Sequence, residues 1–176
     1  TTLAEQEGAK SGDSGKYENF VNRELRPLEE LIDTDNIHGW LQARIHDAEG
    51  RYAALVSAIL KEDSGALPRI KEEVFAFGAS NAVEADASPA EAYRYYGDNL
   101  VNGMPCDHVD RVTEQAEDHI SWTLDQDLHG EFWIEAGQSP ALYYELRLEE
   151  MRGMLSGTAL TLTMPSEMSY ELRAKA

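Results

Sequence analysis

Cysteine and lysine are scarce in this sequence of 176 residues, and a long apolar run is missing from it. Cys106 is the only cysteine, which excludes a disulfide within the chain and a zinc site built from several cysteines. No stretch approaches the roughly 18 apolar residues that a membrane helix needs. The first residues also lack the basic-then-apolar pattern of a secretion signal. We therefore expect a cytoplasmic or virion-associated protein with no membrane insertion.

Basic residues are few in general. Five lysines and ten arginines face 33 acidic residues, so the formal net charge is -18. Binding to phosphate backbones depends on Lys and Arg, so this balance argues against a nucleic-acid partner. An acidic surface with little lysine stays solvated in concentrated salt, which screens its self-repulsion. The composition is typical of halophilic proteins, although an acidic mesophilic subunit or a DNA mimic fits it as well.

Hydrophobic residues make up 42% of the chain, enough for one folded core. We divide the sequence into a flexible, extended tail (1–16), a helical domain (17–157), and a C-terminal β-hairpin and tail (158–176). The expected fold class is mainly α, a single-domain bundle of five to six helices that ends in the hairpin.

The helices are predicted from apolar residues that recur every three or four positions. Residues 17–32 form the first helix, in which Pro27 produces either a kink or a new start. Residues 37–60 form a long amphipathic helix. The pair Ser88 and Glu91 indicates a capping box in front of a short helix. The other expected helices are 68–77, a fifth between Asp107 and Gly130, and a sixth over 139–155.

The end of the chain changes to a period of two, which predicts a β-hairpin with its turn at 165–167. A lone hairpin is marginal in water, so its apolar face must cover the core or join another chain. We keep both possibilities open. If the face is an interface, its residues are Leu160, Leu162, Met164, Met168, Tyr170 and Leu172.

Neighbouring aromatic residues on a helix cannot all point into one core. Tyr95 and Tyr143 each adjoin another tyrosine, so we expect them to be partly exposed and available to a partner.

A metal site is the alternative with most chemical support, because five histidines are present. The Glu-x-x-His motif of di-iron bundles is absent, and His46 with Glu49 is the one reversed pair. A site would need a further ligand from another helix, and His119 is the candidate. No cofactor is predicted unless this site forms. The common nucleophile and phosphate-loop motifs are also absent.

These features favour a non-catalytic structural or assembly subunit, possibly part of a larger complex or virion. It would bind a protein partner or self-associate through the tail, the hairpin and the exposed tyrosines. Two alternatives remain. One is a helical metal-dependent oxidase or hydrolase that uses His46, Glu49 and His119. The other is a chaperone-like or DNA-mimic acidic binding protein.

Overall fold

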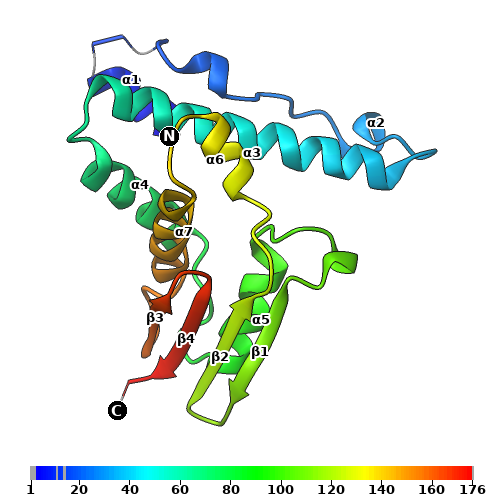
Figure 1. Ribbon diagram of the computed structural model, residues 1–176, viewed down its shortest axis with the longest axis vertical. Coiled ribbons are helices and arrows are strands. Elements are labelled where there is room, and N and C mark those ends of the chain that lie inside the picture. Colours follow the sequence, from blue (N-terminus) through cyan, green and yellow to red (C-terminus); the bar gives the residue numbers. More distant parts are fainter. Residues whose placement is uncertain (1–2, 11, 14, 176) are drawn as a thin grey trace.

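A computed structural model describes residues 3–10, 12–13 and 15–175 of the chain. It is mainly helical, with one four-stranded antiparallel sheet (Figure 1). The α-helices are α1 (Leu3–Lys10), α2 (Leu28–Leu31), α3 (Ile37–Glu62), α4 (Leu67–Ser80), α5 (Pro89–Asn99), α6 (Gly130–Glu135) and α7 (Pro140–Met154). The strands are β1 (Asp110–Gln115), β2 (His119–Leu124), β3 (Leu160–Ser166) and β4 (Ser169–Ala174), and short 3-10 turns occur at Glu18–Phe20 and Pro105–Asp107.

The long helices confirm the periodic pattern. α3, α4, α5 and α7 lie within two residues of most of their predicted ends, because strong start and stop signals flank them. Ser88 Oγ accepts a hydrogen bond from the Glu91 amide, and the Glu91 side chain accepts one from the Ser88 amide, which completes the predicted capping box of α5.

Removing this cap should have a measurable effect. We expect Ser88→Ala to lower the free energy of unfolding by about 1 kcal/mol, because an amide of the first turn of α5 loses its acceptor. Urea denaturation followed by circular dichroism measures the difference. Ser64→Ala, in the exposed link between α3 and α4, serves as the control and should stay within about 0.5 kcal/mol of the parent. Equal stabilities of the two variants would contradict the role of the cap.

The predicted helix between Asp107 and Gly130 is wrong. This segment forms the hairpin of β1 and β2 and the turn into α6. Ile120, Trp122 and Leu124 alternate with more accessible residues and all three are buried, which is the period of two of a strand rather than the period of a helix. β2 is a central strand, and its packing against β4 therefore outweighs a weak helical pattern.

The sheet has the order β1-β2-β4-β3, so the C-terminal hairpin does not stand alone. β4 pairs with β2, and Trp122 lies opposite Tyr170 in the register. The C-terminal hairpin itself is confirmed, but its turn falls at Glu167 and Met168, slightly later than predicted. Met168 has a φ of 60°, a left-handed conformation that a tight turn requires. β1 is exposed along its whole length and forms a charged edge.

Among the first 32 residues, the described ones differ from the predicted tail over 1–16 and from the predicted helix over 17–32. The segment expected to be an extended tail contains α1, whose Ala4 and Glu7 are buried. The expected helix over 17–32 is reduced to a 3-10 turn and the short α2, separated by extended residues that lie beside α3 (Figure 1). Pro27 directly precedes α2, which agrees with a new helix start at this proline. Arg51 of α3 donates a hydrogen bond to the Phe20 carbonyl at 3.0 Å and fastens this segment.

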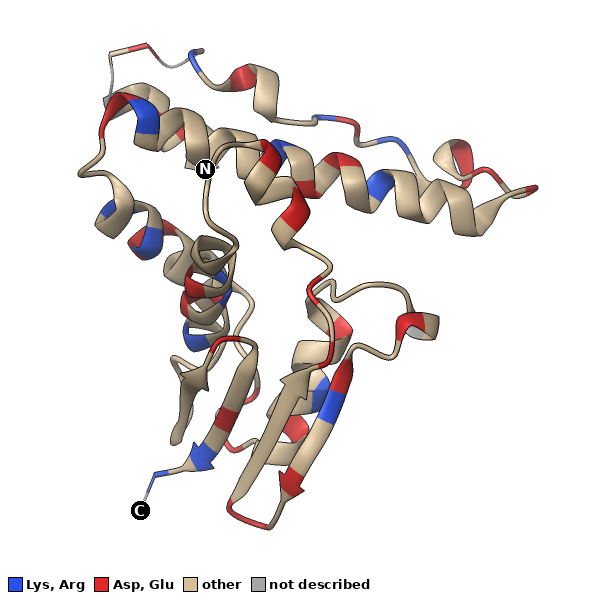
Figure 2. Cartoon of the chain, viewed as in Figure 1, with Lys and Arg blue, Asp and Glu red and all other residues tan. Residues whose placement is uncertain are grey.

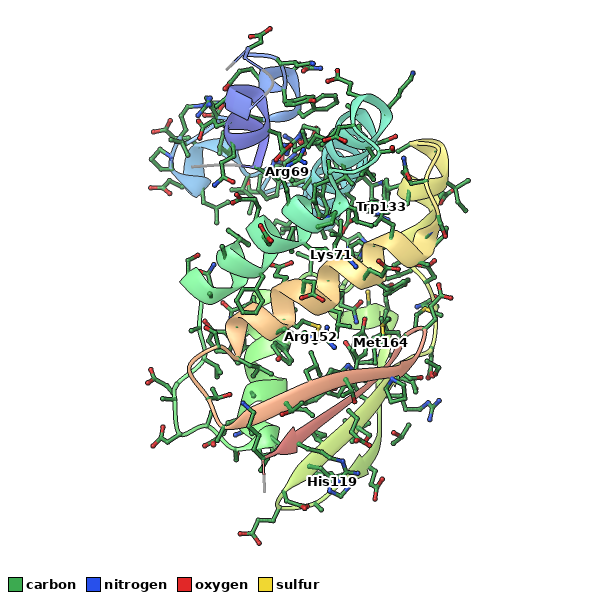
Figure 3. All side chains as sticks on the ribbon, turned by 90° about the vertical axis from the view of Figure 1, so that its left-hand side faces the viewer. Arg69, Lys71, His119, Trp133, Arg152 and Met164 are labelled. Atoms are coloured by element: carbon green, nitrogen blue, oxygen red, sulfur yellow. The ribbon has the colours of Figure 1, made fainter. Side chains whose placement is uncertain are left out.

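The elements form layers. α3 and the N-terminal segment lie at one end, α4 and α7 cross in the middle, and the sheet lies at the other end (Figure 3). α4 and α7 approach closely at two glycines, Gly78 and Gly153, where a Cβ atom would overlap a backbone carbonyl of the opposite helix. α5 and α7 pack against the sheet and bury Trp122 and Tyr170 between them.

Candidate functional site

The three predicted metal ligands do not come together. Glu49 of α3 contacts His129, and His46 packs its ring edge-on against Phe132. His119 is the first residue of β2, lies far from Trp133 of α6 (Figure 3), and contacts the carboxylates of Asp118 and Glu114. Within the described part of the chain, no three His, Cys, Asp or Glu side chains group so that they could hold a metal ion.

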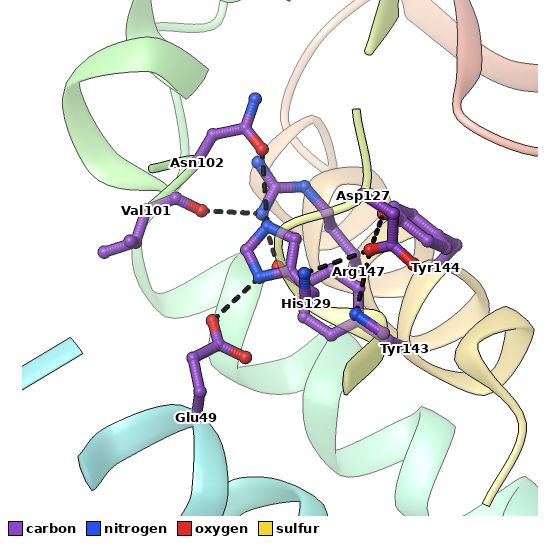
Figure 4. A network of polar contacts seen from close by, with 9 residues as sticks. Glu49, Val101, Asn102, Asp127, His129, Tyr143, Tyr144 and Arg147 are labelled. Carbon is purple, nitrogen blue, oxygen red and sulfur yellow. Dashed lines mark hydrogen bonds and ion pairs between the residues drawn. The ribbon is translucent and has the colours of Figure 1, made fainter. Parts of the chain in front are cut away.

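A polar network around His129 takes the place of that site (Figure 4). The ring is only 2% exposed, its Nδ1 lies 3.0 Å from Glu49 Oε1, and its Nε2 lies 3.3 Å from Asn102 Oδ1. It also stacks on Tyr143, with ring centroids 4.1 Å apart. The second Glu49 oxygen is buried without a hydrogen-bond partner among the described residues. These contacts join α3, the link after α5, and α7.

Asp127 connects this network to the start of α6. Its Oδ1 accepts hydrogen bonds from the Tyr144 hydroxyl at 2.6 Å and from the Gly130 amide at 2.8 Å. Burial alone would raise the pKa of Asp127, but these hydrogen bonds outweigh it and lower the pKa. Asp127 therefore remains a carboxylate that orients α6 beside His129.

Arg147 of α7 occupies the other side of Tyr143. Its Nη1 donates to the Tyr143 hydroxyl at 2.7 Å and to the Val101 carbonyl at 2.9 Å. The guanidinium carbon also lies 5.9 Å from the centre of the Tyr143 ring. One edge of the guanidinium is thus fixed by the protein.

Arg147 lines a cavity of about 450 Å³ between α5, α7 and the sheet. One part of the wall is aromatic: the Tyr93 and Trp122 rings are 5.0 Å apart, and Trp122 stacks on Tyr170 at 5.2 Å. Tyr96 completes this wall and is fixed by a hydrogen bond from its hydroxyl to the Met151 carbonyl. Burial raises the pKa of Tyr170 to about 12, so its hydroxyl stays protonated at neutral pH.

The predicted interface residues fall into two groups. Leu160, Leu162, Tyr170 and Leu172 are buried in the chain's own core, so the first of the two alternatives for the hairpin, core cover, describes them. Met164 and Met168 are half-buried against the same core. Tyr95 is half-buried and donates to the Asn81 carbonyl, whereas Tyr143 is buried, contrary to the exposure that we expected for it.

Exposed apolar side chains gather elsewhere. Four of the nine large hydrophobic residues exposed in the described structure lie between residues 25 and 41, and Leu25 is 91% exposed. The buried residues of α3 all lie at or after Ala53, and its first half contacts the rest of the chain only at partly buried positions such as His46 and Glu49 among the described residues. We call this part the apolar end segment; its exposed residues are Leu25, Leu28, Ile37 and Leu41.

The negative charge is distributed over the molecule. Figure 2 shows acidic residues on most helices and strands, with basic residues between them. Several form local ion pairs, such as Arg111 with Asp125 and Arg69 with Asp63. The acidic residues are thus not confined to one element of the fold.

Sequence reasoning missed His129 and Arg147. For Arg147 a signal was present: it lies three residues after Tyr144 and four before Met151, inside the apolar stripe of α7. A charged residue in such a stripe indicates a buried polar contact. His129 offered no comparable signal, since its partners Glu49 and Asn102 are distant in the sequence.

Comparison with known proteins gives no relative: the chain matches no family model, no curated protein and no solved structure. In the ranges that the structure describes, none of the helices has both the length and the apolar character required to cross a bilayer. The function must therefore be argued from the cavity, the polar network and the apolar end segment.

Proposed function

We propose that this chain is a non-catalytic assembly subunit, which self-associates or joins a protein partner through the apolar end segment. The observation that supports the proposal is the exposure of Leu25, Leu28, Ile37 and Leu41 near the free end of α3. Exposed apolar residues that cluster in this way are typical of protein contact sites. This segment replaces the hairpin as the expected contact, because the apolar face of the hairpin is covered within the chain.

The first half of α3 supports the same proposal. Helices are normally stabilised by packing along one face, yet residues 37–52 contain no fully buried position. Ile37 and Leu41 are one turn apart and therefore lie on one side of α3. A second protein surface that covered this side would supply the packing that the single chain lacks.

The acidic surface determines the salt concentration at which we expect the protein to assemble. We propose that the charge of -18 adapts the protein to high ionic strength, where screening within a few ångströms weakens repulsion between copies. Self-association should consequently strengthen from about 0.1 M to about 3 M salt.

Light scattering coupled to size exclusion tests self-association, the first form of the proposal. We expect a mass above the 19.6 kDa of one chain, rising with concentration and salt. The double variant Leu25→Glu/Ile37→Glu should return the mass to one chain, with little loss of stability because both positions are exposed.

The matched control is Phe77→Glu/Ile134→Glu, which places the same two charges at exposed residues of α4 and α6 and should leave the assembly intact. A single-chain mass at every concentration and salt would exclude self-association. A mass that falls equally in the control would show that added charge, rather than the apolar end segment, governs assembly.

A further inference from the structure

The aromatic cavity described above is not required by an assembly role. Its volume of about 450 Å³ lies within the ~300–1,000 Å³ that is usual for small-molecule sites. Residues from α5, β2, β4 and α7 form its wall, so it lies where the helical layer meets the sheet. Rings of Tyr93, Tyr96, Trp122 and Tyr170 line it, and they offer flat apolar surfaces to a planar ligand.

Arg147 has no ion-pair partner in the described structure, which indicates that the ligand carries a negative charge. Seven of the ten arginines form ion pairs with carboxylates in the described structure. Arg44 and Arg94 do not, but both are exposed, whereas Arg147 is half-buried and has no carboxylate within ion-pair distance among the described residues. A half-buried cation without a partner at ion-pair distance is unusual, above all in a chain with 33 acidic residues.

The geometry of Arg147 suits a carboxylate. Both of its hydrogen bonds to the described protein use Nη1, so Nη2 and Nε remain available on the fixed guanidinium. A guanidinium edge can donate two parallel hydrogen bonds to one carboxylate. Asp110 also lines the cavity and attracts Arg147 electrostatically, but its carboxylate accepts a hydrogen bond from Asn102 at 2.7 Å and forms no ion pair with Arg147.

Tyr170 provides an independent sign of a ligand. It is 2% exposed and lines the cavity, and its hydroxyl has no hydrogen-bond partner among the described residues. A buried hydroxyl without a partner costs about 1–3 kcal/mol, so folded proteins rarely keep one. A polar atom of a bound molecule would satisfy it.

We propose that this cavity is a binding site for a small aromatic carboxylate. Arg147 pairs with the carboxylate, the hydroxyl of Tyr170 donates to the ligand, and the four aromatic side chains enclose its ring. This site is independent of the apolar end segment, since the two share no residue.

The test uses three aromatic acids, benzoate, cinnamate and indole-3-acetate, each paired with its uncharged amide. Binding to the full chain is measured from NMR shifts of the Trp122 indole N–H. We expect saturable binding of at least one acid and at least tenfold weaker binding of its amide. A tenfold difference in affinity corresponds to the loss of about one charge-assisted hydrogen bond. Acetate, which has no ring, should bind at least tenfold more weakly than the best acid.

Two variants connect the binding to the named residues. Arg147→Lys keeps the positive charge but loses the guanidinium edge that donates two parallel hydrogen bonds. It should weaken binding of the best acid at least tenfold. Tyr170→Phe should also weaken it, while the melting temperature stays equal to or above that of the parent, because no contact within the described chain is lost. Arg111→Lys, at an exposed ion pair on β1, is the matched control and should bind like the parent.

Each possible result supports or overturns a different part of the proposal. If none of the three acids binds, or if each amide binds as well as its acid, the proposal is overturned. Equal binding of acetate would overturn the aromatic part of it. Unchanged affinity in both Arg147→Lys and Tyr170→Phe would place the binding elsewhere. Self-association, measured by mass, can succeed or fail without altering any of these results.

Discussion

Gly153→Ala is expected to destabilise the protein by about 3 kcal/mol or more, although it adds a single methyl group to a helix. The new Cβ would overlap the carbonyl oxygen of Phe75 and lie 2.9 Å from the Ala79 amide nitrogen. Both atoms belong to the backbone of α4, so no side-chain rotation can relieve the overlap. The two helices would have to separate, and overpacking of this kind costs about 1–3 kcal/mol even where side chains can yield.

The matched control is Gly50→Ala in α3. A Cβ at Gly50 meets nothing within 4 Å, so this variant should gain about 1 kcal/mol from helix propensity. Urea denaturation of both variants gives the comparison. Similar free energies of unfolding for Gly153→Ala and Gly50→Ala would show that α4 and α7 do not approach as closely as described.

The same contact appears from the other side at Gly78. A Cβ there would overlap the Glu150 carbonyl of α7. Because either alanine alone forces the helices apart, the double variant Gly78→Ala/Gly153→Ala should cost less than the sum of the two single variants. If the two losses of stability simply add, each alanine is instead accommodated by local changes at its own position.

The part of the fold that the sequence predicts well is local. α3 has a long apolar stripe, and α5 begins at a capping box that involves only Ser88 and Glu91. Apolar and polar residues alternate in the C-terminal hairpin, which determines the side that faces the core, although the register shifts once between Thr163 and Ser166. Each of these signals lies within a few residues, so no knowledge of the remaining chain is needed to read it.

The part that it does not predict depends on pairing between distant segments. β2 is a strand because β4, nearly fifty residues later, pairs with it, and the register places Trp122 opposite Tyr170. The candidate site has the same origin, since Glu49 meets His129 and Arg147 meets Val101 only in the folded chain. The 3-10 turn at Glu18–Phe20 likewise has a distant partner, because Arg51 of α3 donates a hydrogen bond to the Phe20 carbonyl.

The polar network at His129 leads to the second large effect. His129→Leu should lower the free energy of unfolding by about 3–5 kcal/mol, because it leaves the Glu49 carboxylate without its partner in a largely buried place. The Glu49 side chain is only 12% exposed, and one of its oxygens already has no hydrogen-bond partner among the described residues. Glu49→Leu should have a smaller cost, since an imidazole without its partner is easier to bury than a carboxylate without its partner.

A double-mutant cycle distinguishes this explanation from simple loss of packing. In Glu49→Leu/His129→Leu no polar group of the pair remains, so the double variant should be more stable than His129→Leu alone. If the ring of His129 mattered only as a packing element against Tyr143, the double variant would be the least stable of the three. Urea denaturation of the parent and the three variants decides between these orders. The first order would mean that Glu49 and His129 hold the first half of α3 near the start of α6 as a compensated polar pair, in addition to the core contacts of its second half.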